Sequence, residues 1–155
     1  SLRAEHDADV IIENYLEGRE FSVAIIKDRA FDKLIAMPLE LIAPKDINGD
    51  RMLGHEIKSS NHEQAIGVTD PNERSMITKF ALDVFHALGA RDYGRIDIRC
   101  DSEGVPYFLE ANLIPSLIEG YGSFPKAYKL NRNVEYDEMI KTIVSLGLSR
   151  VPAVV

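Results

Sequence analysis

The side chains best suited to chemistry lie in residues 93–112. The sequence Asp-Ser-Glu-Gly at residues 101–104 is a turn signal between two strand-like runs, so this region predicts a β-hairpin. Side chains alternate between the two faces of a strand. The alternation predicts a core face of Ile96, Ile98, Cys100, Val105, Tyr107 and Leu109. It places on the opposite face Arg95, Asp97, Arg99, Phe108, Glu110 and, just beyond the strand, Asn112.

The second face predicts a site for a divalent cation near the open end of the hairpin. Carboxylate and amide oxygens are the ligands that Mg²⁺ or Mn²⁺ prefers. With the turn centred on Ser102 and Glu103, Arg95 would face Glu110 and Cys100 would face Val105. The same alternation is also typical of a hairpin with one solvated face that carries a surface ion pair, and by itself it favours that interpretation. The loop that follows Glu110 shifts the balance towards a site, because loops at strand ends commonly hold ligands.

The remaining chain supplies the elements that must position this hairpin. Apolar and β-branched runs predict strands at residues 10–16, 20–27 and 31–42, which suggests an antiparallel meander. Residues 44–70 are polar and are expected to be irregular. Helical spacing predicts a helix over residues 71–88, capped by Asp70 and ended by Gly89, and a second over 135–147, closed by Gly147. The expected fold class is mixed α/β (α+β), with helices packed on a largely antiparallel sheet.

Composition limits the classes of function. The 155 residues, 45% hydrophobic and 28% charged, are typical of one compact domain, residues 1–155. The formal net charge of −7 argues against nucleic acid as the main partner. No apolar run has the length of a membrane span, and the first residues lack the pattern of a signal peptide. The single cysteine fits a reducing cytoplasm.

Two blocks of the sequence together resemble the ATP-grasp enzymes. The first is Gly94-Arg95-Ile96-Asp97 with Leu109-Glu110-Ala111-Asn112 and Pro115, which looks like their metal-binding signature. The second, residues 12–24, resembles their adenine-side strand and turn. The blocks occur in family order, and the resemblance spans about residues 9–148, where it is most similar to D-alanine–D-alanine ligases. It implies the C-terminal portion of an ATP-grasp fold.

The resemblance also implies roles at the phosphate end of ATP. Asp97, Glu110 and Asn112 would hold Mg²⁺ or Mn²⁺, with two ions expected. Arg95 would stabilise charge on the transferred phosphoryl group or the tetrahedral intermediate. Lys58 resembles the lysine that these ligases place on the phosphates from a loop, although a solvated loop lysine is the rival interpretation.

The resemblance implies that residues 13–20 contact the adenosine end of ATP. Glu13 and the backbone of Asn14 and Leu16, with Tyr15 between them, would border the adenine. Glu20 would accept hydrogen bonds from the ribose hydroxyls, whereas the alternative is an exposed glutamate at a strand edge.

The implied activity joins a carboxylate to an amine through an acyl phosphate, with ATP and a small amino acid or carboxylate as partners. The chain departs from the ligases near the second substrate. Ser59 stands where a tyrosine usually follows the lysine, Ser116 stands where a glycine follows the proline, and Ser123 with Phe124 is the nearest match to the carboxylate-binding pair. A ligase for another amino acid and a nucleotide-binding module without turnover therefore stay open, as does a homodimer. Because upstream phosphate-binding elements are not found, we expect a C-terminal portion of a longer ligase that is inactive alone.

Overall fold

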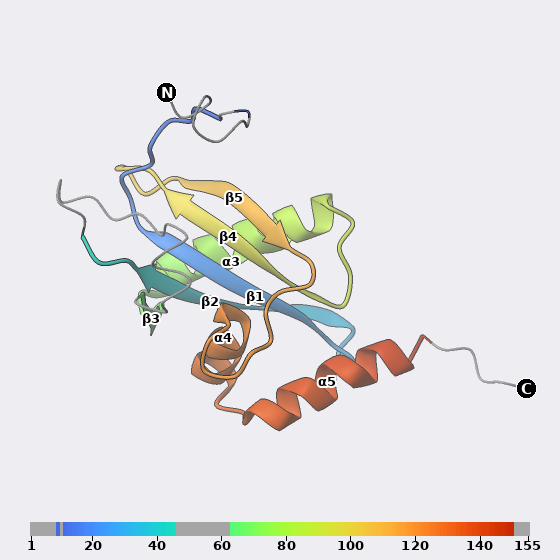
Figure 1. The fold of residues 1–155 in the computed structure, drawn as a ribbon. Coiled ribbons are helices and arrows are strands. Elements are labelled where there is room, and N and C mark those ends of the chain that lie inside the picture. The colour runs from blue at the N-terminus through green and yellow to red at the C-terminus, as the bar shows by residue number, and fades with distance from the viewer. Residues whose placement is uncertain (1–8, 10, 46–62, 151–155) are drawn as a thin grey trace, which may run out of the picture.

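A computed structural model describes residues 9, 11–45 and 63–150 of the chain. They form one antiparallel sheet and three helices (Figure 1), which confirms the predicted mixed α/β class with a largely antiparallel sheet. The strands are β1 (Glu20–Asp28), β2 (Lys33–Ile42), β3 (Gln64–Gly67), β4 (Tyr93–Cys100) and β5 (Pro106–Asn112), in the order β3-β2-β1-β4-β5. The helices are α3 (Pro71–Ala87), α4 (Ser123–Arg132) and α5 (Tyr136–Leu148). Among the described residues, no helix combines the length and the apolarity that crossing a membrane requires.

Strand β1 is the centre of the sheet and is buried on both faces. It pairs with β2 on one side and with β4 on the other, so both rows of its backbone hydrogen-bonding groups are used. Phe21, Val23 and Ile25 point to one face, and Ala24 and Ile26 point to the other. This double burial explains the nearly continuous apolar run that predicts the strand.

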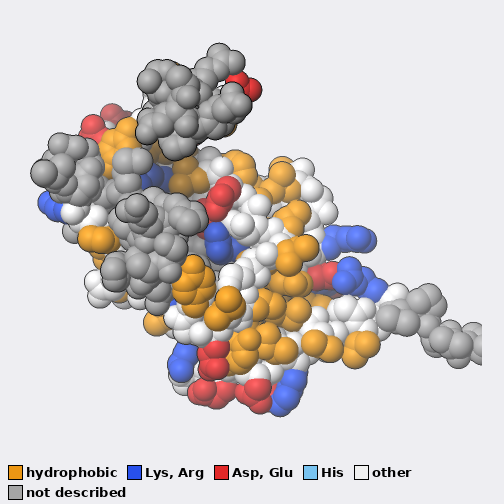
Figure 2. All heavy atoms as spheres, in the orientation of Figure 1, with side chains coloured by type: hydrophobic (Ala, Val, Ile, Leu, Met, Phe, Trp, Pro, Cys, Tyr) orange, Lys and Arg blue, Asp and Glu red, His pale blue; other side chains and the backbone are white. Residues whose placement is uncertain are grey.

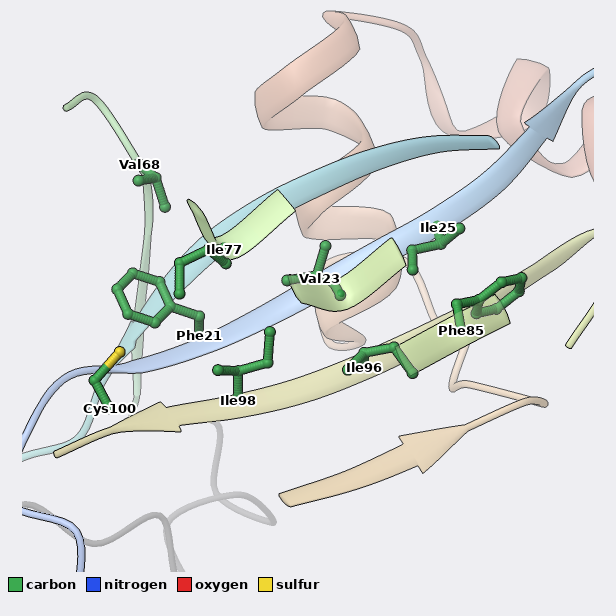
Figure 3. Packing of buried hydrophobic residues seen from close by; sticks show 10 residues of the cluster. Phe21, Val23, Ile25, Val68, Ile77, Phe85, Ile96, Ile98 and Cys100 are labelled. Carbon is green, nitrogen blue, oxygen red and sulfur yellow. The ribbon is translucent and has the colours of Figure 1, made fainter. Parts of the chain in front are cut away.

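Helix α3 covers the first face. Its side chains Ile77, Ala81 and Phe85 are fully buried against β1 and β4 (Figure 3). The predicted ends are confirmed. The Asp70 carboxylate accepts a hydrogen bond from the Glu73 backbone N–H at 2.8 Å, and Gly89 follows the helix at a positive φ of 63°.

Helices α4 and α5 pack on the opposite face and cover only part of it. The buried residues of this layer are Ala24, Ile26, Met37, Leu39, Leu41, Phe124, Ala127, Tyr128, Met139 and Leu146, and the two that belong to β1 lie at the centre and in the second half of that strand. At the other end of β1 the same face carries Glu20 and Ser22. This polar part of the face, which α4 and α5 leave free, is where the candidate site lies.

Three predicted elements differ from the structure. Residues 11–16 are not a strand, and Ile11 and Ile12 are 82% and 92% exposed. Their apolar run is a strand signal, but both edges of β1 are already paired, and no described strand pairs with these residues. The polar stretch 44–70 contains β3, which joins the edge of β2. Gly147 does not close the last helix, which continues to Leu148.

Helix α4 is absent from the sequence-based prediction. Pro125 interrupts its pattern, although proline is tolerated in the first turn of a helix. The buried residues Phe124, Ala127 and Tyr128 stand at positions i, i+3 and i+4, which is the signal that could have revealed the helix.

Two glycine substitutions should change stability in opposite directions. A Cβ on Gly18 would lie less than 3.0 Å from the carbonyl oxygens of Cys100 and Asp101, so Gly18→Ala should lower the free energy of unfolding by about 1–3 kcal/mol. A Cβ on Gly147, inside α5, meets no atom within 4 Å, so Gly147→Ala should raise it by about 0.5–1 kcal/mol. Urea denaturation monitored by circular dichroism measures both. Equal effects of the two variants would contradict the close packing at Gly18.

Candidate active site

A row of charged and polar side chains lies on the same face of the sheet as α4 and α5, beside these helices. Glu20 lies opposite Arg99, and Ser22 lies opposite Asp97, in the pairing of β1 with β4. Asp97 lies opposite Glu110, and Arg95 lies opposite Asn112, in the pairing of β4 with β5. Directly opposed residues of an antiparallel pair share a face, so these side chains lie together, as predicted. On the surface shown in Figure 2, acidic and basic groups lie side by side over this part of the sheet.

The register of the hairpin differs from the prediction. Cys100 pairs with Pro106 rather than with Val105, and a β-bulge at Leu109 shifts the ladder between Ile98 and Asp97. Before the bulge the predicted faces of β5 are wrong, because Tyr107 lies opposite Arg99 and Phe108 lies opposite Ile98. Beyond the bulge the extra residue restores the predicted side, and Glu110 and Asn112 stand on the same face as Asp97.

Asp97 is the centre of a network of charge-assisted hydrogen bonds. Its carboxylate accepts from Arg95 Nε at 2.9 Å and Nη2 at 2.6 Å, and from Ser22 Oγ at 2.7 Å. Arg95 Nη2 also reaches Glu110 Oε1 at 3.4 Å, and Asn112 Nδ2 donates to the same oxygen at 3.2 Å. One arginine therefore binds both carboxylates and holds them together.

Burial shifts the pKa of Asp97. Removal from water raises the pKa of this carboxyl, although Arg95 and Ser22 act in the opposite direction. An added positive charge would stabilise the ionised form. The site is thus built so that its buried acid gains from a cation beyond the one that Arg95 supplies.

The donor set fits Mg²⁺ or Mn²⁺. Asp97 and Glu110 supply carboxylate oxygens and Asn112 supplies an amide. Within residues 9, 11–45 and 63–150, no cluster of three or more His, Cys, Asp or Glu side chains could hold a metal ion. Two carboxylates are the usual protein contribution to a Mg²⁺ site whose remaining ligands are water and phosphate oxygens.

Arg99 organises the segment expected at the adenosine end. Its guanidinium donates to Leu16 O at 2.6 Å, to Glu20 Oε2 at 2.9 Å and to Tyr15 Oη at 2.9 Å, and it lies over the Tyr15 ring at 4.9 Å from the centroid. These contacts wall one side of a pocket of about 550 Å³ that also includes Glu40 and Lys45.

The structure divides the expected adenosine-end residues into two groups. Tyr15, Leu16 and Glu20 are brought together, with Tyr15 and Glu20 lining this pocket. Glu20 is buried rather than an exposed strand-edge glutamate. Glu13 and Asn14 are exposed and do not line it.

A second, smaller pocket of about 120 Å³ lies beside the acids. Arg95 and Asp97 form one wall, and Ser116, Tyr121, Gly122 and Ser123 supply another, with Leu41 and Glu63 completing the lining. A Cβ on Gly122 would lie less than 3.0 Å from the Ser116 carbonyl oxygen, so the loop closes tightly here.

The pair expected to bind the substrate's carboxylate is divided by the structure. Ser123 lines the smaller pocket, whereas Phe124 is fully buried between α4 and the sheet, in edge-to-face contact with Tyr93. A phenylalanine can bind a carboxylate only through its backbone N–H, so the burial of the ring does not test the predicted role of Phe124, which stays a prediction. Lys58 and Ser59 lie outside the described residues.

Sequence reasoning missed three residues of this region. Ser22 carried a signal, since it is a polar residue within an apolar strand. Arg99 stood on the predicted polar face but had no assigned partner. Glu63 carried no signal, because its place in the smaller pocket depends on the packing of distant segments.

Comparison with known proteins gives consistent matches. The family described as "D-ala D-ala ligase C-terminus" matches residues 2–145. The D-alanine–D-alanine ligase of Nitrosococcus oceani is 30% identical over 144 residues, which cover 93% of this chain and 43% of that protein. The corresponding ligase of Nitrosospira multiformis is 32% identical over 146 residues, which cover 94% of this chain and 45% of that protein.

A solved structure shares the fold. The D-alanine–D-alanine ligase from Bacillus anthracis, complexed with ATP, superimposes with a TM-score of 0.66 at 19% identity, over 88% of this chain and 40% of that chain. The chain thus spans less than half the length of the relatives it matches.

The pKa of Asp97 predicts the effect of Asp97→Asn on stability. A raised pKa means that the folded protein binds this proton more tightly than the unfolded chain does, so ionisation lowers the free energy of unfolding at neutral pH. In buffer without divalent cations at neutral pH, Asp97→Asn should therefore unfold at a higher temperature than the unsubstituted protein. The difference should shrink as the pH falls through the raised pKa towards about 3.9, the value in an unfolded chain.

Scanning calorimetry at a series of pH values measures this difference. A lower unfolding temperature for Asp97→Asn at neutral pH would show that the ion pair with Arg95 outweighs the cost of burial.

Proposed function

Because the chain belongs to the D-ala D-ala ligase C-terminus family, we propose that it is the C-terminal part of an ATP-dependent carboxylate–amine ligase. One observation carries this proposal. The buried Asp97, the opposed Glu110 and the bridging Arg95 occupy a polar sheet face between two pockets. The chain would supply the metal ligands and part of the nucleotide site of the longer enzyme.

The two pockets fit the two ends of the reaction. Arg99, in the larger pocket, and Asp97, in the smaller one, are two residues apart on β4, which is about 7 Å along a strand. The larger pocket would receive the nucleoside, with Tyr15, Leu16 and Glu20 at its wall and Glu13 and Asn14 beside it. The phosphates would extend along β4 towards Asp97 and Glu110.

Each polar residue would have a definite task. Asp97, Glu110 and Asn112 would hold two Mg²⁺ or Mn²⁺ ions, which neutralise charge on the phosphates when bound. Arg95 is a planar cation within reach of both acids and would stabilise the oxygens of the transferred phosphoryl group. Lys58 would contact the phosphates from residues 46–62, a segment outside the described residues.

The proposed reaction proceeds in two steps. The substrate carboxylate takes the terminal phosphoryl group of ATP, which releases ADP. The amine then attacks the acyl carbon, and the tetrahedral intermediate expels phosphate. Positioning and electrostatic stabilisation account for this catalysis, and no side chain becomes covalently modified.

By the names of the relatives, D-alanine would be both the substrate that supplies the carboxylate and the substrate that supplies the amine. A ligase for another amino acid or small carboxylate is the second candidate, and it is favoured by Ser59 and Ser116, which stand where the family usually has tyrosine and glycine. We place the enzyme in the cytoplasm, where a reducing environment keeps the buried free thiol of Cys100 reduced. A homodimer is compatible with this assignment.

Replacing one metal ligand should weaken cation binding and leave the fold intact. Glu110→Gln should lower the affinity for Mn²⁺ in the presence of ATP by at least about tenfold, because it removes a carboxylate ligand. The Glu110 side chain is 53% exposed, so the free energy of unfolding should change by less than about 0.5 kcal/mol. Glu103→Gln, in the turn of the same hairpin, is the matched control. Equal Mn²⁺ affinities for the two variants would exclude Glu110 as a ligand.

The activity is tested by ADP release with Mg²⁺ and ATP across a panel of D- and L-amino acids. We expect amino-acid-dependent release from the longer protein to which we assign the chain, and none from residues 1–155 alone. Stimulation by D-alanine would support the D-alanine assignment, and stimulation by another amino acid would support the second candidate. ATP binding without release across the panel would favour a nucleotide-binding module. ADP release by residues 1–155 alone would contradict their assignment as one part of a longer enzyme that is inactive alone.

A further inference from the structure

Glu63 carries a buried carboxylate oxygen that has no partner. Its side chain is 8% exposed, and Oε1 accepts a long hydrogen bond of 3.5 Å from Lys126 Nζ. Oε2 is the one buried side-chain oxygen or nitrogen of the described residues that lacks a hydrogen-bond partner. An unsatisfied buried polar group costs about 1–3 kcal/mol, and more when it is charged, so such an atom needs an explanation.

The location of Glu63 indicates what could satisfy this oxygen. Glu63 lines the smaller pocket together with Arg95, Asp97 and Ser123. The Arg95 guanidinium is already bound to Asp97 and Glu110. Arg95 is therefore already engaged, and a donor that enters this pocket and reaches Glu63 would supply the missing partner.

The size and charge of the pocket restrict the ligand. A water molecule takes roughly 30 Å³ in the liquid, so a volume of about 120 Å³ holds only a few non-hydrogen atoms. A carboxylate accepts but cannot donate, and it bonds most strongly to a cationic donor. These limits fit the ammonium group of a small amino acid.

We propose that Glu63 is a specificity-determining residue that binds the ammonium group of the attacking amino acid through Oε2. This inference rests on the proposed ligase function. Either an ammonium group or a hydroxyl can donate to the carboxylate, but only the ammonium group carries a positive charge and adds an ion-pair attraction. Glu63 therefore selects an amine over the corresponding hydroxy acid. The bound ammonium group must release one proton to water before its nitrogen can attack the acyl carbon, and Glu63 is assigned the binding step alone.

A purely structural role for Glu63 makes a different prediction. In that case the ion pair with Lys126 would only hold α4 near the start of β3, and loss of either partner would have the same effect. Lys126→Gln is therefore the matched control for Glu63→Gln, because each removes one charge from the pair.

Steady-state kinetics of the longer protein test the proposal. Glu63→Gln should raise KM for the attacking amino acid at least about tenfold, with KM for ATP unchanged. It should also reduce the preference for the amino acid over its hydroxy-acid analogue by a similar factor. Lys126→Gln should change neither ratio comparably. An unchanged amino-acid KM in Glu63→Gln, or equal changes in both variants, would overturn the proposal.

A binding measurement separates this proposal from the proposed function. Methylammonium chloride titrated into residues 1–155 should shift the amide NMR signals of Glu63 and Ser123, and sodium chloride at equal ionic strength should not. The shifts should be lost in Glu63→Gln and retained in Lys126→Gln. If the longer protein shows no amine-dependent ADP release but these shifts occur, the ligase function fails and the cation site stands. If release occurs without the shifts and with an unchanged KM in Glu63→Gln, the cation site fails and the ligase function stands.

Discussion

The two unlike faces of β4 are the constraint on which the structure depends. Ile96, Ile98 and Cys100 fill the core under α3, while the alternate positions carry Arg95, Asp97 and Arg99. A slip of one residue would place three charges in that core and three apolar side chains on the polar face. The register of β4 against β1 is therefore strongly specified. The ion pairs that Arg95 and Arg99 make in the candidate site are anchored to this strand.

The charges of the polar face are arranged in pairs that leave room for ligands. Arg99 is satisfied by Glu20, Tyr15 and the Leu16 carbonyl, so it shapes one pocket. Arg95 is shared between two carboxylates, whose lone pairs exceed what one guanidinium can use. Buried ion pairs contribute little net stability against apolar packing. Their retention on this face is better explained by the binding of charged ligands than by folding.

Strong local patterns explain how much of the fold could be predicted. The apolar run of β1, the caps of α3 and the alternation of β4 depend on neighbouring residues, and each was predicted correctly. The bulge at Leu109 and the burial of Phe124 depend on packing between distant segments. The same is true of Arg99, whose bond to Leu16 joins residues separated by 83 positions. The residue types that share one face of the site could be predicted from the sequence. The hydrogen-bond partners of these residues could not.

The bulge in β5 makes two parts of the hairpin independent of each other. On the turn side of Leu109, the strand follows one phase of alternation, and on the side of Glu110 it follows the opposite phase. A residue lost from the turn at positions 101–105 could be offset by straightening the bulge, which would return Glu110 to its place opposite Asp97. The number of residues in the turn can therefore change during evolution while Glu110 stays opposite Asp97. A conserved site and a variable hairpin tip are compatible in the same twenty residues for this reason.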